Sequence, residues 1–186
     1  AGDAARFDLR SVATHEIGHF LGLGHSAIGE TEPRPDGGRR VLGSGAVMFP
    51  ISLGRGIVTD RTLQPDDIAG ASDLYPDDDF RSDTGIITGR VRLNGAPVKG
   101  ANVIAFNPQT GSLISNFSNA DGTFRIAGIT PGPHVIRVEP IDDADIDSFL
   151  EPQGVNVNFQ VTFYDKLIVA PVGGASTSFD VTVQAK

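Results

Sequence analysis

Apolar and histidine positions near the N-terminus recur at the spacing of a helix. The spacing predicts a helix from about Leu9 to Leu21. The positions on one face of it are Val12, His15, His19 and Phe20, with Ile17 and Leu21 beside them. Asp8 can begin this helix by accepting a hydrogen bond from a free backbone N–H. Gly22 and Gly24 can end it, because glycine readily adopts a positive φ.

A second helix is predicted from Pro65 to Leu74. Proline suits a first helical turn, and the carboxylates of Asp66 and Asp67 favour a helix N-terminus. Pro76 would stop the helix. Residues 26–46, between the two helices, are rich in proline and glycine, so we expect a loop there.

The second half of the chain consists of short alternating patterns that predict strands. They cover residues 86–93, 101–106, 113–118, 123–127, 134–138, 157–164, 166–170 and 178–184. The Asn-Ala-Asp-Gly sequence at residues 119–122 is a turn signal before the fourth strand. Short strands at this spacing favour an antiparallel β-sandwich.

This change of pattern predicts two domains. Residues 1–79 hold both helical patterns and three of the four histidines, and residues 84–186 hold the strands. Residues 80–83, in an acidic polar stretch, would form the linker. The expected fold class is therefore α+β.

The composition excludes several classes of protein. A net charge of −8 argues against a nucleic-acid surface, which needs clustered Lys and Arg. No apolar run is long enough to span a membrane. The chain has no cysteine, which excludes disulfides, thiolate zinc sites and cysteine nucleophiles. Residues 1–10 show no signal peptide and Met48 is the only methionine, so we expect this chain to begin inside a longer precursor.

Three histidines in one short window predict a metal site. His15 and His19 lie four residues apart, so a helix presents both rings to one ion. Glu16 is one step round from His15 and can reach a water on that ion without being a ligand. Gly22 permits a turn that brings His25 back toward the pair. Three neutral nitrogens and one open position are typical of a catalytic zinc site.

The alternative is that the pattern is accidental, since His-Glu-x-x-His also occurs by chance on ordinary helices. Here three of only four histidines fall within eleven residues at ligand spacing, with a glycine where the turn needs one. The zinc interpretation is therefore the stronger of the two.

The stretch from His15 to His25 resembles the elongated zinc motif of metzincins, and residues 18–26 resemble the matrixin version. Residues 46–50 (Ala-Val-Met-Phe-Pro) are similar to the matrixin Met-turn, and residues 63–75 to its closing helix. The resemblance implies that Met48 packs beneath the histidines and that Asp66 and Asp67 stiffen the floor of the site. Taken alone, Met48 would be ordinary core and the two carboxylates an ordinary helix start.

The resemblance also implies a mechanism. Zinc lowers the pKa of a bound water, and Glu16 would accept its proton and pass it to the departing amine. The side-chain pocket of the substrate would be formed by Val12, Phe49, Pro50 and Ile51. Ser52 stands where matrixins often have a tyrosine, so the shape of this pocket is open.

Two features depart from the family. Residues 26–45 are longer than the usual connection to the Met-turn. The charged residues in it, which could form a specificity rim, bind an ion or belong to a solvated insertion, are Glu30, Glu32, Asp36, Arg39 and Arg40. Metzincins also have a sheet before the active-site helix that holds the substrate as an added strand, and only eight residues precede the helix here. The resemblance therefore covers the lower half of a zincin domain.

Residues 84–140 resemble the carboxypeptidase regulatory-like domain, a transthyretin-like sandwich. The acidic run at residues 142–147 could bind calcium, but it lacks the glycine and distal glutamate of an EF-hand loop, and a solvated loop is the simpler interpretation. The absence of tryptophan weakens the case for a sugar-binding platform. We interpret His134 as structural.

Two functions remain open. The first is a zinc endopeptidase that acts on protein or peptide substrates outside the cell, a location that follows from the resemblance. The second is a noncatalytic zinc-containing adhesion or binding module in which the sandwich is the working part. The sequence predicts no nucleic-acid partner and leaves the oligomeric state open.

Overall fold

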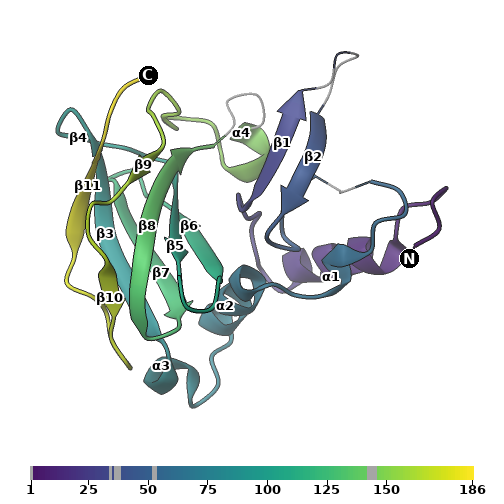
Figure 1. Ribbon diagram of the computed structural model, residues 1–186, viewed down its shortest axis with the longest axis horizontal. Coiled ribbons are helices and arrows are strands. Elements are labelled where there is room, and N and C mark those ends of the chain that lie inside the picture. Colours follow the sequence, from purple (N-terminus) through teal and green to yellow (C-terminus); the bar gives the residue numbers. More distant parts are fainter. Residues whose placement is uncertain (1, 34, 36–38, 52–53, 142–145) are drawn as a thin grey trace.

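The computed structural model describes residues 2–33, 35, 39–51, 54–141 and 146–186. It has an N-terminal part and a β-sandwich part that lie side by side (Figure 1). The elements of the N-terminal part are α1 (Leu9–Phe20), β1 (Gly29–Pro33), β2 (Arg39–Ser44), the 3-10 turn η1 (Thr59–Arg61), α2 (Pro65–Leu74) and α3 (Phe80–Asp83). The predicted second helix has the bounds of α2, whereas α1 ends at Phe20, one residue before the predicted end at Leu21.

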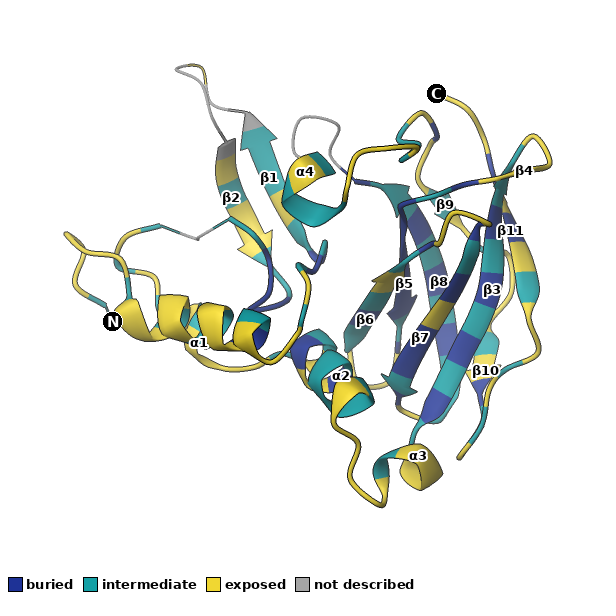
Figure 2. Ribbon diagram, turned by 180° about the vertical axis from the view of Figure 1, so that it is seen from behind, coloured by how far each residue is buried: buried dark blue, intermediate teal, exposed yellow. Residues whose placement is uncertain are grey.

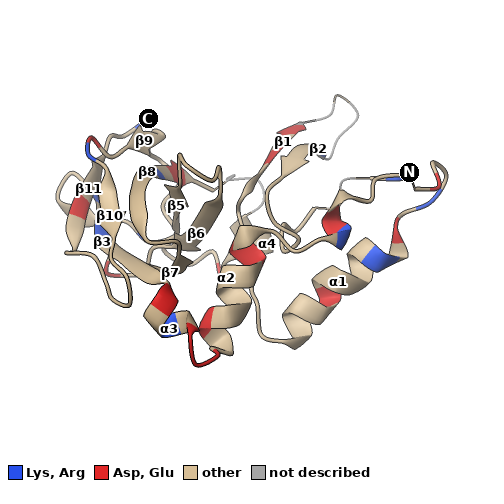
Figure 3. Ribbon diagram, turned by 60° about the horizontal axis from the view of Figure 1, so that its bottom comes forward, with Lys and Arg blue, Asp and Glu red and all other residues tan. Residues whose placement is uncertain are grey.

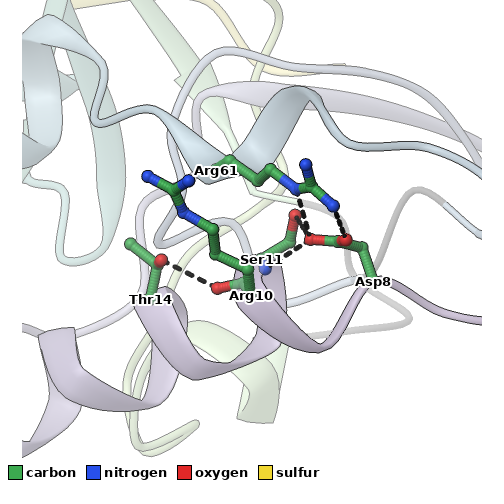
Figure 4. Close-up of polar contacts among 5 residues, drawn as sticks. All are labelled: Asp8, Arg10, Ser11, Thr14 and Arg61. Carbon is green, nitrogen blue, oxygen red and sulfur yellow. Dashed lines mark hydrogen bonds and ion pairs between the residues drawn. The ribbon is translucent and has the colours of Figure 1, made fainter. Parts of the chain in front are cut away.

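Helix α1 begins at a capped and charge-paired residue. Asp8 accepts a hydrogen bond from the N–H of Ser11 at 2.8 Å, and Nε of Arg61 donates to the same carboxylate at 3.0 Å (Figure 4). The Arg61 hydrogen bond, followed by the Ser11 contact, holds the pKa of Asp8 well below its usual range. The cap thus also ties the start of α1 to η1, which follows in the chain some fifty residues later.

Most of α1 faces solvent (Figure 2). Leu9 is 79%, Ile17 56% and Phe20 89% exposed, whereas Gly18 is buried. The covered side of the helix is the one at Gly18, which contacts Met48. The apolar face expected from the spacing is therefore only partly covered by the described residues.

The expectation of a loop over residues 26–46 is wrong in part. β1 and β2 form an antiparallel hairpin whose register shifts between Glu30, opposite Gly43, and Thr31, opposite Val41. The shift leaves one extra residue on β2, as in a β-bulge. Glycine therefore sits at a bulge within the hairpin.

The sandwich consists of two sheets that pack face to face. One sheet has the order β10-β8-β5-β6, with β9 on β8, and the other has the order β11-β3-β4, with β7 on β3. The strands are β3 (Gly85–Leu93), β4 (Ala96–Pro97), β5 (Ala101–Phe106), β6 (Leu113–Phe117), β7 (Thr123–Ile129), β8 (Gly132–Pro140), β9 (Thr162–Phe163), β10 (Ile168–Ala170) and β11 (Phe179–Val183). Burial alternates along β3, and Ile87 and Val91 meet Val103 and Ile136 of the other sheet in one core.

The sequence predicts an antiparallel sandwich, and this prediction is wrong for one pair of strands. β11 runs parallel to β3, with Phe179 opposite Gly89 and Val183 opposite Leu93. β10 and β11 lie in different sheets, so the chain crosses between the sheets before β11, and such a crossover allows parallel pairing.

Several elements differ from the predicted ones. The predicted linker forms the short helix α3, β4 was not expected, and the strand expected over residues 157–164 is reduced to β9 and an isolated bridge between Phe159 and Ala185. A further short helix, α4 (Ile146–Phe149), lies between the sandwich and the β1–β2 hairpin (Figure 1). This helix bears on the candidate site described below.

Helix α2 packs directly on the sandwich. Ala69 belongs to the sandwich core, and the Arg125 guanidinium of β7 binds both carboxylate oxygens of Asp73, at 2.6 and 3.1 Å. Gly128 has a positive φ of 70°, and a Cβ there would lie 2.8 Å from the Cβ of Ala69. The chain that leaves α2 toward α3 is acidic (Figure 3). None of the described helices has the length and apolar character needed to cross a bilayer.

Candidate metal centre

Three imidazole rings converge at the C-terminal end of α1. Nε2 of His19 lies 3.1 Å from Nε2 of His15 and 3.0 Å from Nε2 of His25. His15 and His19 lie on one face of the helix. His25 returns to them because Gly22, with a φ of 96°, turns the chain directly after the helix. Within the described part of the chain, no other three His, Cys, Asp or Glu side chains bring their ligand atoms close enough together to hold one metal ion.

The opposite ring nitrogen of each histidine contacts a backbone carbonyl. Nδ1 of His15 lies 2.8 Å from the oxygen of Val47, and Nδ1 of His19 lies 2.9 Å from that of Leu23. Nδ1 of His25 contacts the carbonyl oxygen of Ser148. A carbonyl only accepts hydrogen bonds, so each Nδ1 carries the proton and each Nε2 keeps its lone pair.

The resulting donor set fits a metal ion. The Nε2 lone pair of His19 lies about 3 Å from those of both other histidines, and all three lie within 4.8 Å of one another, so they repel unless a cation lies between them. With Zn–N distances of about 2.0–2.1 Å, tetrahedral ligands lie about 3.3 Å apart, close to the observed spacing. Imidazole nitrogen suits zinc, and three protein ligands leave one position open. Burial, followed by His19 and His15, lowers the pKa of His25 and so favours the neutral form that binds metals.

The floor of the site is a tight contact between α1 and the following turn. Met48 is 4% exposed, and a Cβ added at Gly18 would lie 2.3 Å from its sulfur. Gly18 stands between His15 and His19 on the helix. Met48 therefore packs against the part of α1 that carries the two histidines.

Asp67 holds the backbone of this turn. It is 2% exposed, and its carboxylate accepts hydrogen bonds from the N–H groups of Val47 at 2.9 Å and Met48 at 3.0 Å. The N–H of Gln64 donates to the same group at 2.8 Å, which closes the capping box of α2. Asp67 thus joins the start of α2 to the turn that contacts His15.

Asp66 has a different set of contacts. Its carboxylate accepts a hydrogen bond from the hydroxyl of Ser26 at 2.6 Å and from the N–H of Ser115 on β6 at 2.7 Å. Burial raises the pKa of Asp66 to about 6 despite these contacts. Ser26 also donates its N–H to the carbonyl of Met48 at 2.9 Å. The sequence interpretation gave no role to Ser26, Ser115 or Ser148, and the last two act through backbone groups that leave no side-chain signal.

The remaining predicted residues are more dispersed. Glu16 is exposed on α1 directly after His15. Phe49 and Ile51 line a cavity of about 710 Å³ between the hairpin and the sandwich, whereas Val12 and Pro50 are not among its lining residues. Ser52 lies outside the described residues. The structure therefore does not gather the four predicted pocket residues around one cavity.

The remaining candidates are the charged residues of the hairpin, the acidic run before α4 and His134. In the hairpin, Glu32 pairs with Arg40 and Glu30 lines the same cavity, while Asp36 and the side chain of Arg39 lie outside the described part. In the acidic run at residues 142–147, residues 142–145 also lie outside the described part of the chain, and Asp147 is exposed on α4. His134 is 2% exposed and contacts the carbonyl of Gly132 at 3.0 Å, in keeping with a structural role.

Comparison with known proteins gives two family matches and several partial relatives. Residues 1–31 match the matrixin model, and residues 86–162 match the carboxypeptidase regulatory-like domain. Metalloendoproteinase 1-MMP of Arabidopsis thaliana is 42% identical over 78 residues, which cover 41% of this chain and 17% of the relative. Metalloendoproteinase 5-MMP of the same plant is 41% identical over 70 residues, covering 37% and 14%. The matches thus span less than a fifth of these relatives.

Solved structures match more weakly. The Bacillus anthracis TIE protein has a TM-score of 0.36 at 10% identity and covers 55% of this chain and 17% of its own. BcpA, the major pilin subunit of Bacillus cereus, has a TM-score of 0.37 at 15% identity and covers 55% and 30%. Scores this low do not establish a shared fold. The resemblance read from the sequence is confirmed for its two segments: residues 1–31 are similar to matrixins, a metalloprotease family, and residues 86–162 to the carboxypeptidase regulatory-like domain.

Proposed function

We propose that this chain is a zinc-dependent endopeptidase whose metal is held by His15, His19 and His25. The observation that supports this most is the convergence of three Nε2 atoms whose Nδ1 atoms all contact carbonyl oxygens. Such outer contacts fix the tautomer and orientation of metal-binding histidines. The partial relatives carry the name metalloendoproteinase, which points to the same chemistry.

In this proposal Glu16 is the general base. Zinc held by the three histidines would polarise a water and the peptide carbonyl. Glu16 accepts the proton of the attacking water and later delivers it to the departing amine. Its exposed position next to His15 leaves it free to reach a substrate. Met48 and Asp67 keep the turn beneath the histidines in place, and Asp66 supports the segment after His25.

We further propose that residues 1–79 act as the lower half of a matrixin-like catalytic domain and that residues 84–186 form a separate sandwich domain joined by residues 80–83. Phe49 and Ile51 would help to hold a substrate side chain, whereas Val12 and Pro50, which do not line the same cavity, are left out of this pocket. The substrate is a protein or peptide met outside the cell. A calcium ion at residues 142–147 has no support from the described residues.

Metal analysis combined with a cleavage assay tests the proposal. We expect one zinc per chain in the wild type and in Glu16→Ala, and cleavage of an unstructured protein to fall at least about 100-fold in Glu16→Ala. Asp165→Ala, which removes an exposed carboxylate between β9 and β10 of the sandwich, is the matched control and should cleave normally.

Each other outcome has a defined meaning. Zinc bound by wild type and Glu16→Ala without cleavage by either contradicts the endopeptidase. That result favours the noncatalytic module in which the sandwich does the work. A wild-type chain that binds no zinc contradicts both functions.

A further inference from the structure

One of the three histidine contacts comes from the sandwich part of the chain. His15 and His19 contact carbonyls of the N-terminal part, at Val47 and Leu23. His25 instead contacts the carbonyl of Ser148 in α4, which is 123 residues away in the sequence. The three histidines are therefore not held by one part of the molecule alone.

Helix α4 is fixed by aromatic contacts on both of its sides. The Phe149 ring lies 6.3 Å, between centroids, from Phe49 beside the Met48 turn and 6.3 Å from Phe117 on β6. His25, Phe149 and Leu150 line the same small cavity of about 260 Å³. Phe149 therefore sets the position of α4 relative to the histidine that Ser148 contacts.

The chain after α4 is tied back to the sandwich. The N–H of Asn156 donates to the carbonyl of Lys99 at 3.1 Å, and the ammonium of Lys99 donates to the carbonyl of Gln153. At the other end, Ile141 is buried directly after β8. The position of α4 thus depends on the sandwich sheet.

A second set of contacts links the sandwich to Ser26, the residue that follows His25. Ser115 of β6 donates its N–H to Asp66, and Asp66 accepts the hydroxyl of Ser26, the residue after His25. The sandwich therefore contacts the ring of His25 through α4 and its chain through α2.

We infer that the sandwich forms part of the metal centre: the Ser148 carbonyl orients His25, and Phe149 is the positioning residue that keeps it there. This rests on the proposed zinc site. The sandwich would then act on metal affinity, in addition to any role of its own in binding. Loss of one outer contact of this kind typically weakens metal binding 10- to 100-fold.

Zinc titration of the full chain, against a chromophoric chelator, measures the effect. We expect Phe149→Ala to raise the zinc Kd about 10-fold or more. Phe149→Leu, which keeps an apolar side chain, should recover most of the affinity. The control is Leu167→Ala, since Leu167 is 57% exposed in the sandwich, lines neither of the two cavities described above and should leave the Kd within about twofold of the wild type.

A second measurement needs no variant. The N–H of Leu150 is bonded to the carbonyl of Ile146 at 2.9 Å, so its hydrogen exchange reports the opening of α4. If the contact between α4 and His25 strengthens zinc binding, then zinc binding must equally stabilise α4, because such a coupling is reciprocal. Zinc must therefore slow this exchange in the wild-type chain. A merely structural role of Phe149 would leave the exchange independent of zinc.

The outcomes separate the two proposals. A wild type that binds zinc, with an unchanged Kd in Phe149→Ala or with zinc-independent exchange at Leu150, overturns the inference and leaves the zinc site standing. A wild type that binds no zinc overturns the proposed function and the inference with it. A weakened Phe149→Ala together with zinc-dependent exchange supports the inference.

Discussion

Nδ1 of His15 lies 2.8 Å from the carbonyl oxygen of Val47. The N–H of Val47 in turn donates to Asp67 at 2.9 Å, so one residue of the turn joins a candidate metal ligand to a buried carboxylate. Asp67 also binds the N–H groups of Met48 and Gln64. The geometry of His15 therefore depends on a carboxylate that does not touch the metal position.

Asp67→Asn tests this dependence. The amide has a single acceptor oxygen, so its NH₂ must face either the N–H of Met48 or the N–H groups of Val47 and Gln64, which donate to the two different oxygens of Asp67. We expect a loss of about 1–3 kcal/mol in the free energy of unfolding, since at least one buried donor is left without an acceptor. Zinc affinity should fall about 10-fold or more as well.

Urea unfolding and zinc titration measure the two effects. Asp78→Asn, at an exposed position of the acidic stretch, is the control and should change neither quantity. An Asp67→Asn chain with wild-type stability would mean that the turn does not need this carboxylate.

Gly18→Ala tests the floor of the site. The added Cβ would meet the sulfur of Met48 at 2.3 Å, so either the turn or α1 must move. Such overpacking costs about 1–3 kcal/mol, and it should also weaken zinc binding because Gly18 lies between two of the histidines. In the Met48→Ala background there is no sulfur to meet the added Cβ. Gly18→Ala should therefore weaken zinc binding much less there than it does in the wild type.

Gly174→Ala is the control, because Gly174 lies in the sandwich and a Cβ there would meet only the side chain of Pro171, at 3.8 Å. The wild type, Gly18→Ala, Met48→Ala and the double variant form a double-mutant cycle, which thermal unfolding and zinc titration measure. Equal effects of Gly18→Ala with and without Met48 would contradict the proposed contact.

Asp66 predicts a specific pH dependence. Its folded-state pKa is raised to about 6, above an unfolded value near 4, so the folded chain keeps a proton that the unfolded chain has lost. This contribution to stability is full below about pH 4 and is lost as the pH rises to about 6. The two-unit difference corresponds to at most about 3 kcal/mol.

Asp66→Asn carries no charge at any of these pH values and can still accept from Ser115. The unfolding free energy of Asp66→Asn minus that of the wild type should therefore increase by up to about 3 kcal/mol between pH 4 and pH 7. Chemical denaturation at several pH values gives this difference, and Asp78→Asn should show none. A difference that stays flat, or falls as the pH rises, would show that Asp66 is not protonated by burial.

Local patterns were sufficient to predict α1, α2 and the convergence of the three histidines, but not the short helices α3 and α4. His15 and His19 are spaced by the helix itself, and Gly22 supplies the turn that His25 needs, so the convergence depends on a few adjacent residues. Pro65 and the two carboxylates after it defined α2 for the same reason. The alternation along β3 and the run of β5 likewise follow from burial of one or both faces.

The remaining features depend on contacts between distant segments. The proline and glycines of residues 26–46 predict a loop because they resemble turn signals, but Pro33 ends β1 and Gly43 lies beside the bulge of β2. The parallel pairing of β11 depends on which sheet the chain enters. The contact between Ser148 and His25 involves a backbone carbonyl, so no side chain in the sequence could indicate it.

Zinc binding should stabilise the sandwich as well as the N-terminal part. The chain has no tryptophan and only two tyrosines, Tyr75 and Tyr164. Tyr164 packs on Phe179 in the sandwich, with ring centroids 4.7 Å apart, so Tyr75→Phe leaves a single tyrosine whose fluorescence reports sandwich unfolding.

With free zinc at about 100 times its Kd, we expect the unfolding of the sandwich to become about 2.7 kcal/mol less favourable. His25→Ala in the same background should lose most of this gain, because it removes both a ligand and the contact with α4. A Tyr164 transition that ignores zinc, while the zinc titration shows binding, would mean that the sandwich unfolds independently of the metal centre.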